Sequence, residues 1–140
     1  MKVSDCRIVD LPQVIDPKGN VVIIEGDKTA PFDIKRVFYM FNTPTGITRG
    51  GHAHKLLHQL IVAIAGSLDV VVDDGAKKKQ VHLDSPQQGL FIPPMIWNEL
   101  LNFSKDAVCV VFASEHYSSD DYIKSYESFQ QMTKIRSVKK

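Results

Sequence analysis

Two histidines separated by one residue are the strongest chemical feature of this sequence. His52 and His54 lie in the stretch Arg49-Gly-Gly-His52-Ala-His54-Lys55, and a third histidine, His58, follows shortly after. In an extended strand, side chains two residues apart point to the same face, about 6.6–7 Å apart along the chain. Two imidazoles on the inner face of a barrel can hold a metal ion or move protons near pH 7. The pair therefore indicates a metal centre or an acid–base site.

The elements that would position this pair are short strands. Turn residues interrupt the chain every few to a dozen residues, and Asp73-Asp74-Gly75 is a hairpin signal. Between the turns lie short β-rich runs, which is typical of an all-β sandwich or barrel. The expected strands are Val21–Glu25, Ile34–Phe41, Leu57–Ala65, Leu68–Asp73, Lys79–Leu83, Gly89–Ile92, Ile96–Phe103 and Val108–Ala113.

The periodicity changes near the C-terminus. Tyr122, Ile123, Tyr126 and Phe129 recur at helical spacing, with acidic residues just before them. One short helix is expected there, packed on the outside of the sandwich. Residues 131–140 are expected to form a tail.

Length and charge limit the possible functions. The 140 residues suit a single domain over residues 1–140, and 17 Lys and Arg against 16 Asp and Glu leave a net charge of +1. A nucleic-acid binder usually carries a clear basic excess, so none is expected here. No apolar run approaches the roughly 18 residues of a membrane span. No signal peptide is expected, and two isolated cysteines predict free thiols in the cytoplasm.

The spacing around the histidine pair resembles the first cupin motif. Gly46, His52, His54 and Gly66 match it, but Gln59 stands where the metal-binding Glu is usual. The segment 89–99, where a second motif would supply another ligand, contains no histidine. A neutral amide is a poor ligand for such metals, so no metal and no cofactor are expected. A metal-dependent cupin, dioxygenase-like and using His52, His54 and His58, is the alternative.

The chain resembles one cupin family more specifically, the dTDP-4-keto-6-deoxyglucose 3,4-ketoisomerases of deoxysugar biosynthesis. The resemblance implies a jelly-roll cupin isomerase that moves the sugar carbonyl from C4 to C3 through an enediol. The matching segments are 16–20, 31–39, 49–55, 66–67, 73–75, 83–86, 94–99 and 121–126.

The resemblance also implies roles for the residues of the pair. His52 is expected to be the base at carbon, and His54 to pass a proton between O3 and O4. Tyr39 is a candidate donor to the developing oxyanion. Phe38 precedes Tyr39, and only one of these two side chains can face the pocket.

A dTDP-linked substrate also needs groups that bind its diphosphate and its base. Arginine suits a diphosphate, so Arg49 is the first candidate and Arg36 the second. Lys18 and Lys55 are further candidates. Trp97, the single tryptophan, could stack on the base, form a wall of the sugar site or pack in the core.

Two further expectations concern the product and the assembly. The Lys18-Gly19 turn resembles the Arg-Gly version of galacto-forming family members, which predicts dTDP-3-keto-6-deoxygalactose. A gluco-configured product is the alternative. Family members are usually homodimers, and residues 1–11 could form a strand that is exchanged between subunits.

Overall fold

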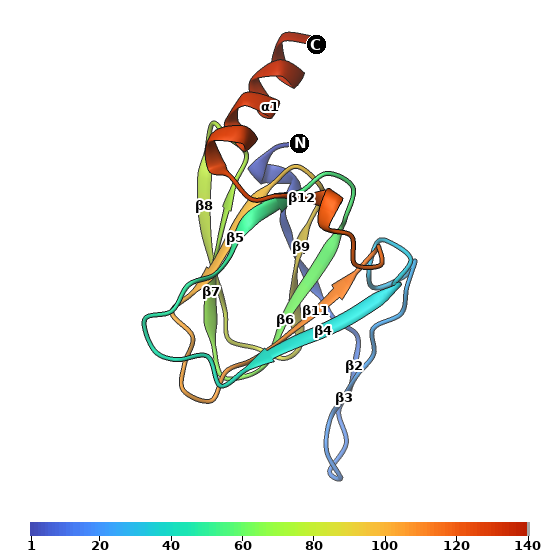
Figure 1. Cartoon of the computed structure of the whole chain (residues 1–140). Coiled ribbons are helices and arrows are strands. Elements are labelled where there is room, and N and C mark those ends of the chain that lie inside the picture. Colours follow the sequence, from blue (N-terminus) through green and yellow to red (C-terminus); the bar gives the residue numbers. More distant parts are fainter. Residues whose placement is uncertain (140) are drawn as a thin grey trace.

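Two five-stranded antiparallel sheets face each other in the computed structural model, which describes residues 1–139 (Figure 1). The first sheet has the order β1-β9-β6-β11-β4, and the second has the order β12-β5-β10-β7-β8. The first comprises β1 (Arg7–Asp10), β9 (Gln88–Ile92), β6 (Gln59–Ala65), β11 (Val108–Ala113) and β4 (Arg36–Phe41). The second comprises β12 (Tyr122–Ile123), β5 (Arg49–His54), β10 (Trp97–Leu101), β7 (Leu68–Asp73) and β8 (Lys78–Leu83). The predicted all-β sandwich is therefore confirmed.

Three helical segments and one small hairpin complete the described chain. The 3-10 turns η1 (Val3–Asp5) and η2 (Ser119–Asp121) precede β1 and β12, and α1 (Tyr126–Lys139) ends the chain. Strands β2 (Gln13–Val14) and β3 (Val21–Val22) form a hairpin that projects from the sandwich (Figure 1). No helix among residues 1–139 is long and apolar enough to cross a membrane.

The core fills the space between the sheets. Alternate residues of β6, β9 and β11 meet alternate residues of β7 and β10, because side chains along a strand point to opposite faces. Two smaller apolar layers cover the outer faces. Residues 11–34 supply Leu11, Ala30 and Phe32 against the first sheet, and α1 places Phe129 against Ala53 and Trp97 of the second.

The C-terminal prediction needs two corrections. Tyr122 and Ile123 form a short strand against β5, paired with His54 and Ala53, and not the start of a helix. The helix begins at Tyr126, where the hydroxyl of Ser125 accepts a hydrogen bond from the Ser128 N–H at 3.2 Å, as an N-cap does. It continues to Lys139, through most of the predicted tail; residue 140 lies outside the described chain. Main-chain pairing with β5 overrides the local helical spacing.

The N-terminal strand lies in the first sheet. Arg7 pairs with Phe91 and Asp10 with Gln88 of the same chain, so residues 7–10 form an edge strand beside β9. Exchange of this strand between subunits stays a prediction.

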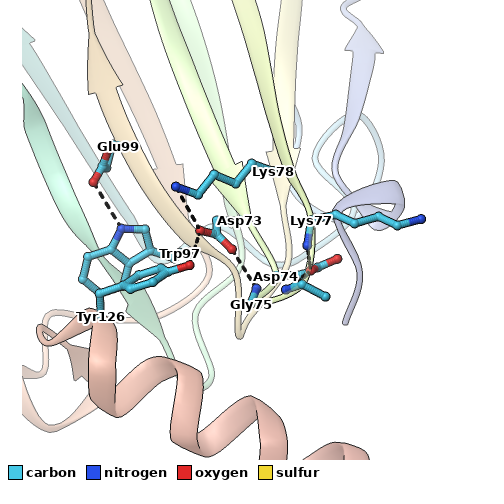
Figure 2. A network of polar contacts seen from close by, with 9 residues as sticks. Asp73, Asp74, Gly75, Lys77, Lys78, Trp97, Glu99 and Tyr126 are labelled. Atoms are coloured by element: carbon cyan, nitrogen blue, oxygen red, sulfur yellow. Dashed lines mark hydrogen bonds and ion pairs between the residues drawn. The ribbon is translucent and has the colours of Figure 1, made fainter.

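A buried carboxylate fastens α1 to the second sheet. Figure 2 shows Asp73 at the β7–β8 turn with the Tyr126 hydroxyl directed toward it. The hydroxyl donates to Asp73 Oδ2 at 2.6 Å, and the Gly75 N–H donates to Oδ1 at 2.7 Å. Asp73 is only 2% exposed, and its carboxylate raises the pKa of Tyr126 to about 12. The predicted Asp73-Asp74-Gly75 hairpin is confirmed, with Gly75 at φ 94°.

We predict that Tyr126→Phe lowers the free energy of unfolding by about 1–3 kcal/mol, because it removes a donor from a buried carboxylate. Urea unfolding followed by circular dichroism measures this loss. Tyr117→Phe is the matched control, since Tyr117 is 66% exposed. Equal losses in the two variants would contradict the anchoring role of Tyr126.

Candidate active site

A cavity of about 170 Å³ opens between the two sheets on the side of β4 and β5. Its floor is apolar, formed by Met40, Ile61, Leu100 and Val111, and its walls are polar and aromatic. The polar and aromatic lining consists of Phe38, Arg49, His52, His54, Gln59, Asn98 and Tyr122, with the backbone of Gly50.

Two consecutive glycines bring the histidine pair into this cavity. Gly50 and Gly51 have φ values of 80° and 75°, a left-handed conformation that other residues rarely adopt. A Cβ atom at Gly50 would lie 3.0 Å from the carbonyl oxygen of Asn98. The register between β5 and β10 shifts beside this position, so that Asn98 lies opposite His52. Gly50 therefore permits the close approach of the two strands, whereas Gly51 contributes only its left-handed backbone, since a Cβ atom there would have no neighbour within 4 Å.

The two imidazole rings lie next to each other and share one aromatic neighbour. Their centroids are 5.0 Å apart with an edge-to-face geometry. The Tyr122 ring lies 4.9 Å from the ring of His52 and 4.4 Å from the ring of His54. Strand β12 thus closes one side of the pair.

Burial keeps the His52 ring neutral. Desolvation and the neighbouring His54 lower the pKa of His52 to about 4, although a hydrogen bond from the ring to the Gly50 backbone acts in the opposite direction. Burial also lowers the pKa of His54, while a hydrogen bond with Asp121 opposes that effect. Both rings are therefore neutral at pH 7, which is the form that accepts a proton.

Two buried donors near the pair have no hydrogen-bond partner among residues 1–139. They are Nδ2 of Asn98 and Nε of Arg36. Asn98 is 2% exposed and lines the cavity. Arg36 lies between the rings of Phe38, at 5.2 Å, and Tyr117, at 5.7 Å, and its charge opposes protonation of His54. Buried donors without a partner are costly, so these two are available to a bound molecule.

The cavity includes some of the predicted residues and excludes others. His52, His54 and Arg49 line it, and Arg36 acts on His54 from nearby. Tyr39 requires a correction, because β4 turns Phe38 toward the cavity and leaves Tyr39 63% exposed on the opposite face.

Of the three roles considered for Trp97, the structure favours packing and leaves this side chain outside the cavity. Asn98 faces the cavity, so the adjacent Trp97 points to the other side of β10. There it packs against Tyr126 and Phe129, and its indole N–H donates to Glu99 at 3.4 Å (Figure 2). Trp97 therefore belongs to the layer beneath α1.

Lys18, Gly19 and Lys55, which were also predicted to contact the substrate, do not line the cavity of their own chain. Lys18 and Gly19 form the exposed tip of the β2–β3 hairpin, where Asp16 caps the turn through a 2.7 Å bond from the Lys18 N–H. Lys55 borders a separate apolar groove with Met95 and Met132.

The three histidines of the metal-dependent alternative do not come together. The ring of His58 lies 6.1 Å from Phe32 and 6.0 Å from Phe91, in the apolar layer outside the first sheet. Gln59 lines the cavity, whereas Glu99 bonds to the indole of Trp97. Within residues 1–139 no group of three or more His, Cys, Asp or Glu side chains could hold a metal ion.

Sequence reasoning missed three residues of the site: Asn98, Asp121 and Tyr122. Asn98 could have been found from the alternation of β10, had the bulge in β5 been known. Asp121 and Tyr122 were predicted to begin a helix, and only their pairing with the end of β5 brings them to the histidines.

The two-sheet sandwich is a cupin-like fold, and its cavity brings together two neutral imidazoles, which are groups able to accept and donate protons. The family described as "FdtA: WxcM-like, C-terminal" matches residues 4–134. The chain therefore belongs to the FdtA/WxcM-like family of sugar 3,4-ketoisomerases, and it is an isomerase.

Individual relatives agree with this family. The chain is 43% identical over 124 residues, 89% of each protein, to the TDP-4-oxo-6-deoxy-α-D-glucose-3,4-oxoisomerase of Aneurinibacillus thermoaerophilus. It is 35% identical to QdtA, a sugar 3,4-ketoisomerase of Thermoanaerobacterium thermosaccharolyticum whose structure contains TDP. The TM-score is 0.93, and the alignment covers 96% of this chain and 98% of QdtA.

Two Campylobacter jejuni enzymes differ in the sugar that they are named for. The WlaRB TDP-quinovose 3,4-ketoisomerase is 37% identical, with a TM-score of 0.88 and coverage of 92% and 99%. The WlaRA TDP-fucose-3,4-ketoisomerase is 29% identical, with a TM-score of 0.89 and coverage of 92% and 96%. The rmlC epimerase of Mycobacterium tuberculosis shares the fold at 15% identity, with a TM-score of 0.72 and coverage of 87% and 69%.

We predict that His52 titrates near pH 4 and that His82 titrates above pH 6.5, because Asp69 raises the pKa of the exposed His82. Unfolded histidine titrates near 6.5. As the pH falls, His52 is therefore protonated in the unfolded chain before it is protonated in the folded protein. Its contribution lowers the free energy of unfolding as the pH falls from about 6.5 to 4. NMR titration of the ring signals measures both midpoints. A His52 midpoint near 6.5 would mean that the ring is solvated and not buried.

Proposed function

We propose that this protein converts TDP-4-keto-6-deoxyglucose into its 3-keto isomer. The observation that carries the proposal is the pair of neutral histidines, His54 buried and His52 half-buried, in a cavity lined by donors. The relatives named for this reaction support the choice of substrate.

The chemistry requires the transfer of protons only. A base removes the proton at C3, which the C4 carbonyl makes acidic, and the electron pair forms a C3–C4 double bond with negative charge on O4. A proton moves from O3 to O4 through a second group, and the C3 carbonyl forms as C4 takes up a proton. We assign carbon deprotonation to His52 and the transfer between the oxygens to His54. Neutral imidazoles suit both steps at pH 7.

The developing negative charge needs donors that are already in place. Asn98 Nδ2 and Arg36 Nε are buried and lack partners among the described residues, so a sugar oxyanion would satisfy both. We therefore replace Tyr39 with these two groups as the oxyanion donors. A donor of this kind contributes roughly 10²- to 10³-fold to the rate.

The size of the cavity favours binding of the sugar alone. At about 170 Å³ the cavity is smaller than the roughly 300–1,000 Å³ of sites that enclose a whole ligand. The nucleotide must then lie at the mouth, where Arg49, the first candidate, is available to the diphosphate, since Arg36 is assigned to the oxyanion. The exposed rings of Phe38 and Tyr117 offer surfaces on which the base could stack.

We also propose a homodimer. Val37, Tyr39 and Phe41 are 52%, 63% and 59% exposed on the outer face of β4, and the β2–β3 hairpin exposes Val14 and Ile15. Exposed apolar surfaces of this kind favour association. Sedimentation at micromolar concentration should give twice the monomer mass, and a monomer there would contradict the proposal.

The two buried cysteines support a reducing compartment, and we propose the cytoplasm. Cys6 and Cys109 are free thiols, and burial raises the pKa of each to about 12. They therefore stay protonated and unreactive at neutral pH.

The proposed product has the galacto configuration at C4. The Lys18-Gly19 turn carries this proposal, because a glycine there leaves room beside the sugar. The turn lies at the tip of a hairpin that projects from its own sandwich (Figure 1). Its contact with a sugar would therefore use the cavity of a second copy, which links the stereochemistry to the dimer.

We expect the isolated protein to convert TDP-4-keto-6-deoxyglucose into TDP-3-keto-6-deoxygalactose. NMR of the reaction mixture reports the position of the carbonyl and the configuration at C4 together. A gluco product would reject the role of Lys18 and Gly19 but keep the ketoisomerase. An unchanged substrate would reject the proposed function.

We expect His52→Asn to reduce kcat about 10²- to 10⁴-fold and to abolish exchange of the C3 hydrogen with solvent deuterium. His54→Asn should also slow turnover, yet it should retain some C3 exchange, because the base at carbon is intact. His82→Asn is the control, since His82 is exposed and bonds to Asp69. If His52→Asn kept the C3 hydrogen exchange and His54→Asn lost it, the roles of the two histidines would be reversed. Turnover within tenfold of the wild type in both site variants would exclude the pair from catalysis.

A further inference from the structure

Asp121 is fixed against the end of β5 by three hydrogen bonds. The Lys55 N–H donates to the Asp121 carbonyl at 2.9 Å, and the Leu56 N–H donates to Oδ1 at 2.7 Å. The third bond joins His54 Nδ1 and Asp121 Oδ2 at 3.0 Å, across 67 residues of sequence. The side chains of His54 and Asp121 are 5% and 10% exposed. The carboxylate is therefore held by the strand and shielded from water.

The third bond determines where the His54 ring carries its proton. A carboxylate has only acceptors, so Nδ1 must be the donor. In the neutral ring Nε2 then keeps its lone pair, and the ring lines the cavity. His52 differs, because its ring bonds to the Gly50 backbone, which is a neutral acceptor. The two histidines share a cavity but differ in the charge of their partners.

We propose that Asp121 is the positioning residue of the site: it fixes the Nδ1–H tautomer of His54 and stabilises its imidazolium, so that His54 can carry the proton between the sugar oxygens. The kinetic part of this inference rests on the proposed function. Asp121 acts through His54 and does not line the cavity.

The charges around His54 are consistent with a proton that is held briefly. Burial and the guanidinium of Arg36 oppose protonation of the ring, whereas Asp121 favours it. The His54 ring is therefore neutral between turnovers. When it takes up a proton, the shielded carboxylate of Asp121 stabilises the charged form. A buried carboxylate beside a histidine has this role in several unrelated enzymes.

Asp121→Asn separates positioning from folding. The amide has the shape of the carboxylate, and its oxygen can still accept from the Leu56 N–H. Its NH₂ group then faces His54 Nδ1, which must become an acceptor, so the proton moves to Nε2. The ring stays in place but presents an N–H to the cavity in place of a lone pair.

The experiment combines ¹⁵N NMR of the histidine rings with kinetics. In the wild type we expect His54 to be protonated at Nδ1, and in Asp121→Asn at Nε2, with the signals assigned by their loss in His54→Asn. We expect kcat to fall about 10²- to 10⁴-fold, with C3 exchange retained as in His54→Asn. In the double variant, adding His54→Asn to Asp121→Asn should lower kcat by less than a further threefold, since the two changes remove the same function.

Asp69→Asn is the matched control, because Asp69 accepts from another histidine, His82, at 2.6 Å on the surface. It should alter the His82 signals and leave turnover unchanged. A wild-type His54 protonated at Nε2 overturns the proposal without any variant, and so does a tautomer change that costs less than tenfold in kcat. If the tautomer changes as expected but the wild type does not isomerise the sugar, the proposed function fails and the positioning by Asp121 stands.

Discussion

Burial of two imidazoles side by side is the constraint on which the site depends. Water would stabilise a charged ring, but the walls of the cavity do so less well, so both rings stay neutral at pH 7 and can accept a proton. This requires a strand that enters the interior with two polar side chains on one face. Gly50 and Gly51 make that entry possible through their left-handed backbone, and the missing side chain of Gly50 lets β5 approach β10.

The same sandwich contains a packed apolar core and an open cavity beside it. Ile61, Leu100 and Val111 contribute to both, since they belong to the core and also form the floor of the cavity. A floor of close-packed apolar side chains gives the cavity a fixed shape and lowers the polarity beneath the polar groups above it. The orphaned donors of Asn98 and Arg36 are costly to the free protein and become useful only with a ligand in place.

The C-terminal segment connects stability to chemistry. Tyr126 binds the buried Asp73, and Phe129 packs on Trp97, so α1 is anchored on the second sheet. This anchoring holds the preceding residues, Asp121 and Tyr122, against the end of β5, where they contact the histidines. Residues 121 and 122, which precede the protruding helix α1 in Figure 1, therefore belong to the site.

The sequence by itself indicated most strands of the sandwich and the shared face of His52 and His54, because these follow from local patterns with a period of two. The turn signal Asp73-Asp74-Gly75 predicted the β7–β8 hairpin, and the resemblance of its motifs indicated the cupin family. The short strand β12 was not predicted. The sequence also did not determine which face of β4 and β10 points inward. A shift of one residue exchanges all side chains between faces, so Phe38 and Asn98 occupy the cavity in place of Tyr39 and Trp97. Only the tertiary structure brought Asp121 to His54, since the pairing of β12 with β5 creates a contact across 67 residues that leaves no trace in local spacing.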